Sequence, residues 1–218
     1  MSAAGYGAQP LVLATRSSGK IRELSALCAA AGLATESLDD AGISESPAED
    51  GIEVFETFAG NARAKARYFA ERLPGRVVLA EDSGLAVVAL GGAPGVLSKR
   101  WSGSTNTGAR LDADNNAALV QRLVGVRDRS ARYVCVAVIV STGAEWSAEG
   151  RVEGRIADVA SGRGGFGYDP WFVSDELGKS FGDATPEEKA MVSHRARAVR
   201  AVLGEAMAVL RHRVRGVS

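Results

Sequence analysis

The sequence has few cysteines, no net charge and no long apolar run. Its 218 residues include only Cys28 and Cys135, and both lie in apolar patterns, so we expect neither a disulfide framework nor a cysteine metal site. The 26 basic and 26 acidic residues cancel, which argues against a general nucleic-acid binder. Because no apolar run approaches the ~20 residues of a membrane span and residues 1–10 lack a signal-peptide pattern, we expect a cytoplasmic protein.

The chain length suits one domain or two closely joined lobes, since 218 residues can bury a full core. The glycines show no fixed spacing, and we find no internal repeat. Residues 1–10 are small and rich in Gly and Ala, and we expect a disordered N-terminal extension there. Residues 11–218 are therefore predicted to form a single domain.

Two adjacent acids follow a short apolar segment near the middle of the chain. Val77–Ala80 predicts a buried strand, and Glu81 and Asp82 follow at its end, where open α/β sheets place ligand sites. Burying a carboxylate costs several kcal/mol unless a cation or a donor meets it, so the pair suggests Mg²⁺ binding or proton transfer. Alternatively the strand turns into solvent here, with Ser83 and Gly84 forming the turn.

A polar loop joins a strand to a helix near the N-terminus. Leu11–Ala14 predicts the strand, and the helix that follows ends at Gly32. Free backbone N–H groups at a helix start attract phosphate, and a lysine in the first turn adds charge. The loop differs from a P-loop at Ala14 and Ile21, and an ordinary turn with a solvated lysine is the alternative. Its residues are Thr15, Arg16, Ser17, Ser18, Gly19 and Lys20.

The next region is acidic and irregular over residues 35–54, and one of its carboxylates could reach a metal ion. An apolar stripe from Phe55 to Leu73 then predicts a helix, closed by Pro74 and Gly75. Lys65 lies at the border of that stripe. It either points into a cleft or lays its stem along the apolar surface with its charge in water, and the second is commoner.

The central part of the chain predicts further strands and one helix. Two cations beside Trp101 either attract a triphosphate or form a surface cation–π contact. An almost wholly apolar run predicts a central strand covered on both faces, and alternation after it predicts a second strand. The elements are a strand over 85–90, a rigid turn over 91–95, a helix over 112–124, the central strand over 133–140 and the alternating strand over 145–154.

A glycine-rich stretch over residues 162–170 is the second informative segment. Its glycines let the backbone approach a flat ligand, while Phe166 and Tyr168 offer ring faces to a base, although a hairpin with exposed aromatics would look similar. Thr185 then begins a helix with a capping box. Lys189 lies in its first turn, against the preference of the helix dipole, which suggests a role other than helix stability. A last helix is predicted from Ala196 to Leu210.

Taken together, four motifs resemble the inosine triphosphate pyrophosphatase family over about Leu11 to Leu210. The resemblance implies an elongated, curved mixed β-sheet flanked by helices, two lobes with the active site in the cleft between them, and a homodimer. It also implies Mg²⁺-dependent cleavage of ITP, dITP and XTP between the α and β phosphates, giving a nucleoside monophosphate and pyrophosphate. The motifs are Glu81–Leu85, Gly91–Gly95, Gly164–Pro170, and Glu188-Lys189 followed by Ser193-His194-Arg195.

By position, the resemblance assigns Asp82 as the general base that activates water. Glu49, Glu81 and Asp82 are implied as metal ligands, but a few extra residues follow Glu49, which leaves Glu53 and Glu56 as rivals. The residues implied in substrate binding are Thr15, Arg16, Ser17, Ser18, Gly19, Lys20, Lys65, Ser83, Phe166, Gly167, Tyr168, Asp169, Lys189, His194 and Arg195.

Two positions depart from the family pattern. Ser17 stands where members commonly have Asn, and Glu81 stands where many bacterial members have Asp. Two other functions therefore stay open, a non-catalytic nucleotide-binding protein and a pyrophosphatase for another modified nucleotide. The Ser17 change motivates the latter.

Overall fold

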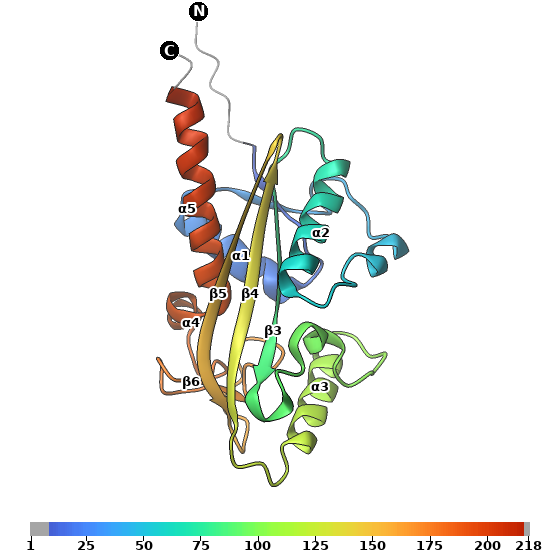
Figure 1. Ribbon diagram of the computed structural model, residues 1–218, viewed down its shortest axis with the longest axis vertical. Helices are drawn as coiled ribbons and strands as arrows, with labels where there is room; N and C mark the ends of the chain where they lie inside the picture. The colour runs from blue at the N-terminus through green and yellow to red at the C-terminus, as the bar shows by residue number, and fades with distance from the viewer. Residues whose placement is uncertain (1–8, 216–218) are drawn as a thin grey trace, which may run out of the picture.

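A mixed six-stranded sheet runs along the length of the molecule in the computed structural model, which describes residues 9–215 (Figure 1). The strand order is β2-β1-β3-β4-β5-β6. β1 lies parallel to both β2 and β3, whereas the pairs from β3 to β6 are antiparallel. The strands are β1 (Leu11–Leu13), β2 (Thr35–Ser37), β3 (Val78–Val87), β4 (Ser130–Ser141), β5 (Ala144–Ile156) and β6 (Phe172–Ser174).

Helices cover both faces of this sheet, as the sequence predicted (Figure 1). α1 and α5 lie on one face, α2 lies on the other, and α3 packs at the lower end of the molecule. The helices are α1 (Ser18–Ala30), α2 (Phe58–Arg72), α3 (Gly108–Arg122), α4 (Pro186–Val192) and α5 (His194–Arg215), with short 3₁₀ helices η1 (Pro47–Gly51), η2 (Val88–Leu90) and η3 (Gly95–Arg100). No helix of the described chain combines the length and the apolar character of a membrane span.

Three apolar clusters meet along β3. Leu79 packs with α1 and α5, and Ala80, which points to the opposite face, packs with α2. Leu85 and Val87 belong to a third cluster with α3, β5 and β6. The polar segment 81–84 therefore separates two apolar cores from a third along a single strand.

The acid pair lies inside β3, so the prediction that it follows the end of the strand was wrong. β4 pairs with the whole of β3, from Val78 opposite Val140 to Val87 opposite Ala131, and this antiparallel ladder keeps the strand extended. The strand that ends here is β1, whose last residue, Leu13, pairs with Leu79. Ala14, the first residue after β1, still donates its N–H to Leu79 O, and beyond this point β3 has no parallel neighbour within the described residues.

Several predicted element boundaries also differ from the structure: α3 begins and ends before the predicted 112–124, and α5 extends beyond the predicted 196–210 at both ends. α2 begins at Phe58 because Thr57 is its N-cap and accepts a hydrogen bond from Gly60 N, whereas Phe55 precedes the helix and is 49 % exposed. The strand expected over 85–90 ends at Val87 and continues as η2.

Other predicted elements are confirmed. The central strand over 133–140 lies in β4 and is almost wholly buried, and alternating burial follows in β5. Thr185 and Glu188 form the predicted capping box of α4. Of the N-terminal extension expected over residues 1–10, only Gln9 and Pro10 are among the described residues.

Candidate active site

The loop between β1 and α1 forms the first side of the site. Ser17 is the N-cap of α1 and accepts a hydrogen bond from Lys20 N, and Thr15 Oγ1 accepts one from Ser17 N at 3.2 Å. Lys20 Nζ lies 2.8 Å from Glu81 Oε1. The lysine side chain is 18 % exposed, so the alternative of a solvated lysine is wrong.

Glu81 points toward the α1 and α5 face and is completely buried. In addition to Lys20, it meets Arg195 Nε at 3.5 Å, and the Cys135 thiol donates a hydrogen bond to Oε2 at 3.3 Å. Burial alone would raise the pKa of this carboxyl group. The positive charges of Lys20 and Arg195 outweigh burial and hold the pKa of Glu81 well below its ordinary value of 4.5.

Asp82 points the other way, toward α2, and is 6 % exposed. Its Oδ2 accepts a hydrogen bond from Asn61 Nδ2 at 2.9 Å, and its Oδ1 accepts one from Ser83 N at 3.0 Å. No ion pair within residues 9–215 includes Asp82. Burial therefore dominates and raises the pKa of Asp82 above 3.8, and the charges of Lys20 and Lys65 offset only part of this effect.

Lys65 and Glu53 lie beside Asp82. Lys65 is 7 % exposed and its Nζ pairs with the Glu53 carboxylate, so the interpretation that its charge reaches into water was wrong. Burial would raise the pKa of Glu53, but Lys65 lowers it. Both side chains act electrostatically on Asp82.

The other two acids considered as metal ligands lie elsewhere. Glu49 forms two hydrogen bonds with Arg16, and Glu56 is exposed. Arg16, which the sequence placed among the phosphate-binding residues, has its guanidinium on the acidic segment. Of the three candidates, Glu53 is the one that the structure brings to Asp82.

A second group of charges lies on the α1 and α5 face around Glu23. Lys189 Nζ is 2.7 Å from Glu23 Oε1 and 2.5 Å from Asp169 Oδ2, and Arg195 Nη1 donates to Glu23 Oε2. The sequence analysis missed Glu23. Its signal was its spacing, because a residue three positions after Lys20 shares the same helix face.

The glycine-rich loop lies over the start of α1. A Cβ added to Gly19 would lie 2.6 Å from Phe166 Cδ1, so only glycine lets the ring lie so close. The Phe166 ring also lies near two cations, with its centroid 5.1 Å from Lys189 Nζ and 5.4 Å from Arg195 Cζ. This ring joins the phosphate loop to the C-terminal cations.

Helix α3 holds the next residue of the loop by both of its backbone groups. Gly167 N donates to Asp112 Oδ2 at 2.9 Å, and Asn116 Nδ2 donates to Gly167 O at 3.0 Å. Tyr168 is 4 % exposed and donates its hydroxyl to Ser98 O, so its ring is not open to a base, and a hairpin with exposed aromatics is wrong.

Of the remaining predicted residues, Ser18 is the exposed first residue of α1, and Ser83 and His194 lie beside Arg195 and Tyr133. Ser83 Oγ accepts a hydrogen bond from Arg195 Nη2 at 3.0 Å. The His194 ring stacks on Tyr133 at 4.5 Å, and its Nδ1 has no hydrogen-bond partner among the described residues. Burial, followed by the charges of Arg195 and Lys189, lowers the pKa of His194 well below 6.5, so the ring is neutral.

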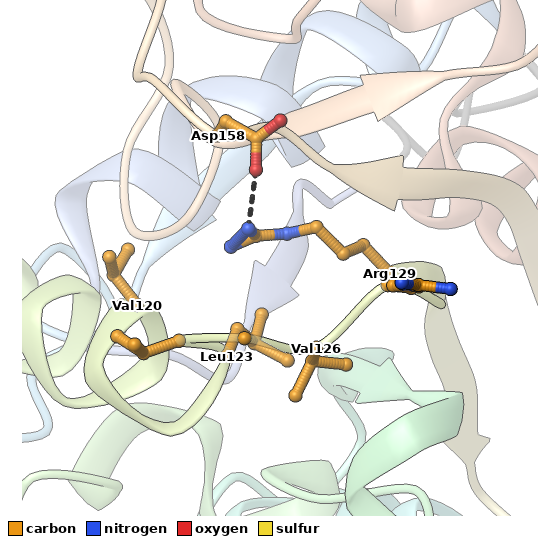
Figure 2. Close-up of a pocket in the computed structure, with 8 residues that line it drawn as sticks. Val120, Leu123, Val126, Arg129 and Asp158 are labelled. Atoms are coloured by element: carbon orange, nitrogen blue, oxygen red, sulfur yellow. Dashed lines mark hydrogen bonds and ion pairs between the residues drawn. The ribbon is translucent and has the colours of Figure 1, made fainter.

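One pocket lies far from these charges. It has a volume of about 440 Å³ and opens between the end of α3 and the start of β4 (Figure 2). Val120, Leu123 and Val126 line it, and its Arg129 forms an ion pair with Asp158 at 2.6 Å (Figure 2). Its lining contains none of the predicted site residues.

Comparison with known proteins places this arrangement in a family. The pattern of the Ham1 family matches residues 11–205. The chain is 44 % identical to the dITP/XTP pyrophosphatase of Acidobacterium capsulatum over 88 % of this chain and 96 % of that protein. It is 45 % identical to the dITP/XTP pyrophosphatase of Ralstonia nicotianae over 87 % and 92 % of the two chains.

Solved structures show the same fold. The Staphylococcus aureus Ham1 protein superposes with a TM-score of 0.76 at 30 % identity, over 92 % of this chain and 99 % of that chain. A nucleoside-triphosphatase (dITP/XTP pyrophosphatase) from Mycobacterium abscessus superposes with a TM-score of 0.65 at 39 % identity, over 88 % and 96 % of the two chains.

Proposed function

The chain belongs to the Ham1 family, and from this premise we propose that it hydrolyses the non-standard purine nucleotides ITP, dITP and XTP to a nucleoside monophosphate and pyrophosphate. The names of its relatives support this function, because the similarity extends over most of both chains. One observation carries the proposal: Glu81 and Asp82 are buried neighbours on β3 whose pKa values are shifted in opposite directions. In such a pair, one carboxylate keeps its negative charge and the other can accept a proton.

Asp82 is the general base in this mechanism. A catalytic base works best when its pKa lies near the working pH, and burial moves the pKa of Asp82 upward. Its hydrogen bonds come from a neutral amide and a backbone N–H, so accepting a proton breaks no ion pair. Asp82 takes the proton of the water that attacks the substrate.

Lys20 and Lys65 bind the polyphosphate, together with the N-terminus of α1. A nucleoside triphosphate carries about four negative charges near neutral pH, which repel a water nucleophile until cations offset them. Glu81 holds the side chain of Lys20 at the start of α1, so the positive charge of the lysine adds to the helix dipole. Lys65 exchanges Glu53 for a phosphate oxygen when the substrate binds.

The same carboxylates fit a magnesium ion. Glu53 and Asp82 offer the hard oxygen ligands that Mg²⁺ prefers, and Mg²⁺ usually needs only one or two carboxylates besides substrate phosphates. The described residues contain no group of three or more side chains placed to hold a metal ion. A Mg²⁺ site made of two carboxylates and substrate phosphates does not require such a group. We assign Mg²⁺ to Asp82 and Glu53, with Glu81 behind them. When bound, the ion supplies charge neutralisation and a lower pKa for its water.

Base selection rests on hydrogen-bond donors. Hypoxanthine and xanthine carry an oxygen at position 6, where adenine carries an amino group. Neutral His194 and the Arg195 guanidinium are buried donors that would donate to this oxygen, whereas the amino group of adenine offers them no acceptor, a penalty of roughly 1–3 kcal/mol for each unmet group. Ser17 caps the N-terminus of α1 with its side chain. This structural role explains a serine at the position whose departure from the family pattern motivated another modified nucleotide as the substrate.

Pyrophosphate release from ITP, dITP, XTP, GTP and ATP with Mg²⁺ tests the function. We expect turnover of the first three, little of ATP, and loss of turnover in Asp82→Asn. Binding of ITP without release of pyrophosphate would instead indicate a non-catalytic nucleotide-binding protein. The family resemblance also leads us to propose a cytoplasmic homodimer, and sedimentation of the purified protein would test its assembly.

A further inference from the structure

Arg16 uses its guanidinium to hold the acidic segment between β2 and α2. Its Nε and Nη2 donate to the two oxygens of Glu49 at 3.1 and 2.8 Å, which makes a bidentate pair. Its Nη1 donates to Asp39 Oδ1 at 2.6 Å, and Nη2 also donates to Ile43 O at 3.0 Å. Four hydrogen bonds therefore join one residue of the phosphate loop to three residues that lie 23 to 33 positions away.

The segment that Arg16 holds leads directly to Glu53. Glu49 lies in η1, and Ile52, which follows η1, is buried in the apolar cluster of α2. Glu53 comes next: its carboxylate pairs with Lys65, and its carbonyl accepts a hydrogen bond from Arg100 at 3.2 Å. Arg16 thus fixes the segment before Glu53, and Arg100 holds the carbonyl of Glu53 itself.

We propose that Arg16 is a positioning residue: its pair with Glu49 holds Glu53 in reach of Lys65 and Asp82, while neither Arg16 nor Glu49 contacts the nucleotide or the metal ion. The inference rests on the proposed function and departs from the roles that the sequence suggested for both residues. A planar guanidinium suits this task because it binds a carboxylate at two points, which a lysine does not.

Charge supports a positioning role over phosphate binding. For Arg16 to reach a phosphate, its pair with Glu49 must break, and the partner left behind is a carboxylate that is only 15 % exposed. An unpaired, half-buried anion beside a polyphosphate is repelled by it. With the pair intact, Lys20, Lys65 and Arg195 remain as the cations that act on Glu81 and Asp82.

A double-mutant cycle on pyrophosphate release from ITP separates the two roles. We expect Arg16→Ala and Glu49→Ala each to lower kcat by roughly tenfold to a hundredfold with little change in KM, because a misplaced carboxylate weakens the chemical step. The double variant should be no worse than either single variant. Additive losses, with a higher KM in Arg16→Ala, would show separate contacts with phosphate and metal and would overturn the proposal.

Two further measurements exclude a merely structural effect. Glu53→Gln should show no additional loss of kcat when combined with Arg16→Ala, since both act through the same carboxylate; additive losses would contradict the proposal. Thermal unfolding without Mg²⁺ and nucleotide should show the same coupling between Arg16 and Glu49. Independent effects on unfolding would mean that the pair does not form in solution, and the proposal would fail.

The chain offers a matched control in the ion pair of Arg76 and Glu36. This pair also joins an arginine to a glutamate of the region before α2, and its side chains are 20 % and 19 % exposed, close to the 20 % and 15 % of Arg16 and Glu49. Arg76→Ala should lower the unfolding temperature and leave kcat unchanged. An equal loss of kcat in both arginine variants would overturn the positioning role, whereas a wild type inactive on every nucleotide would refute the proposed function.

Discussion

Glu81 and Asp82 are chemically similar neighbours on one strand, yet the structure holds them in opposite electrostatic states. Alternation along β3 turns Glu81 toward the cations of the α1 and α5 face and Asp82 toward the amide of Asn61 on α2. The pKa of the first is lowered and that of the second is raised. The comparison teaches that the face of the strand, rather than the residue type, decides which carboxylate anchors charge and which accepts a proton.

The largest effect should come from the α2 face. Asp82→Asn keeps the shape of the side chain but removes the proton acceptor and leaves one oxygen to accept the two hydrogen bonds from Asn61 and Ser83, so kcat for ITP should fall by about 10²- to 10⁴-fold. Steady-state pyrophosphate release measures it. Activity within a few-fold of the wild type would mean that another residue is the general base. Asp82 would then not differ from Glu81 in being the proton acceptor.

On the opposite face, the main loss should be in stability. Glu81→Gln leaves Lys20 and Arg195 buried without their shared carboxylate, and removal of one partner of a buried ion pair costs about 3–5 kcal/mol. Urea unfolding at neutral pH would give the change in free energy. A variant as stable as the wild type would show that Glu81 does not anchor these cations.

A smaller change tests how far the ionised form of Glu81 depends on the hydrogen bond from the Cys135 thiol. Cys135→Val removes the S–H that points at Glu81 Oε2 but keeps both cations, so the free energy of unfolding should fall by no more than about 1 kcal/mol. Cys135→Ser, which keeps a donor, serves as the control. If the Val variant lost as much stability as Glu81→Gln, the thiol rather than the cations would be what keeps Glu81 ionised.

The smallest effect is expected at the pocket beside α3. Val124 lines it and is 79 % exposed, so Val124→Asp should change the free energy of unfolding by less than about 0.5 kcal/mol and leave kcat for ITP as it was. The same pyrophosphate assay provides the check. A marked loss of turnover would mean that this pocket, and not only the carboxylates of β3, takes part in the reaction.

The sequence predicted the elements around the site well, because apolar periodicity and capping residues are local signals, while the mixed sheet was implied by the resemblance to the family. Four apolar residues before Glu81 predicted β3, and Thr185 with Glu188 predicted the start of α4. The prediction that the strand ends at Glu81 failed because the pairing that extends β3 comes from β4, about fifty residues later in the chain.

Side-chain partners were less accessible to prediction. The position of Lys65 on the helical wheel did not reveal Glu53, and the residues before α2 offered three candidate acids with no local signal to choose among them. Arg16 was predicted to bind phosphate because its neighbours in the loop suggested a phosphate site. Its actual partner, Glu49, lies 33 residues away. Such choices depend on tertiary contacts that periodicity does not encode.

The difference between the two carboxylates can be measured directly as stability against pH without Mg²⁺. A lowered pKa means that Glu81 stabilises the fold above its unfolded value of 4.5 and loses this effect as the pH falls through the folded value. A raised pKa has the opposite sign, so ionised Asp82 destabilises the fold as the pH rises through its folded value above 3.8.

The most direct test is therefore the free energy of unfolding of Asp82→Asn and Glu81→Gln, measured from acid to mildly alkaline pH in the presence of a chelator. We predict that Asp82→Asn is at least as stable as the wild type above the folded pKa of Asp82, while Glu81→Gln is less stable there and approaches the wild type as the pH falls. Loss of stability in both variants at neutral pH would contradict the account, because it would show that both carboxylates serve the fold as ion-pair anchors.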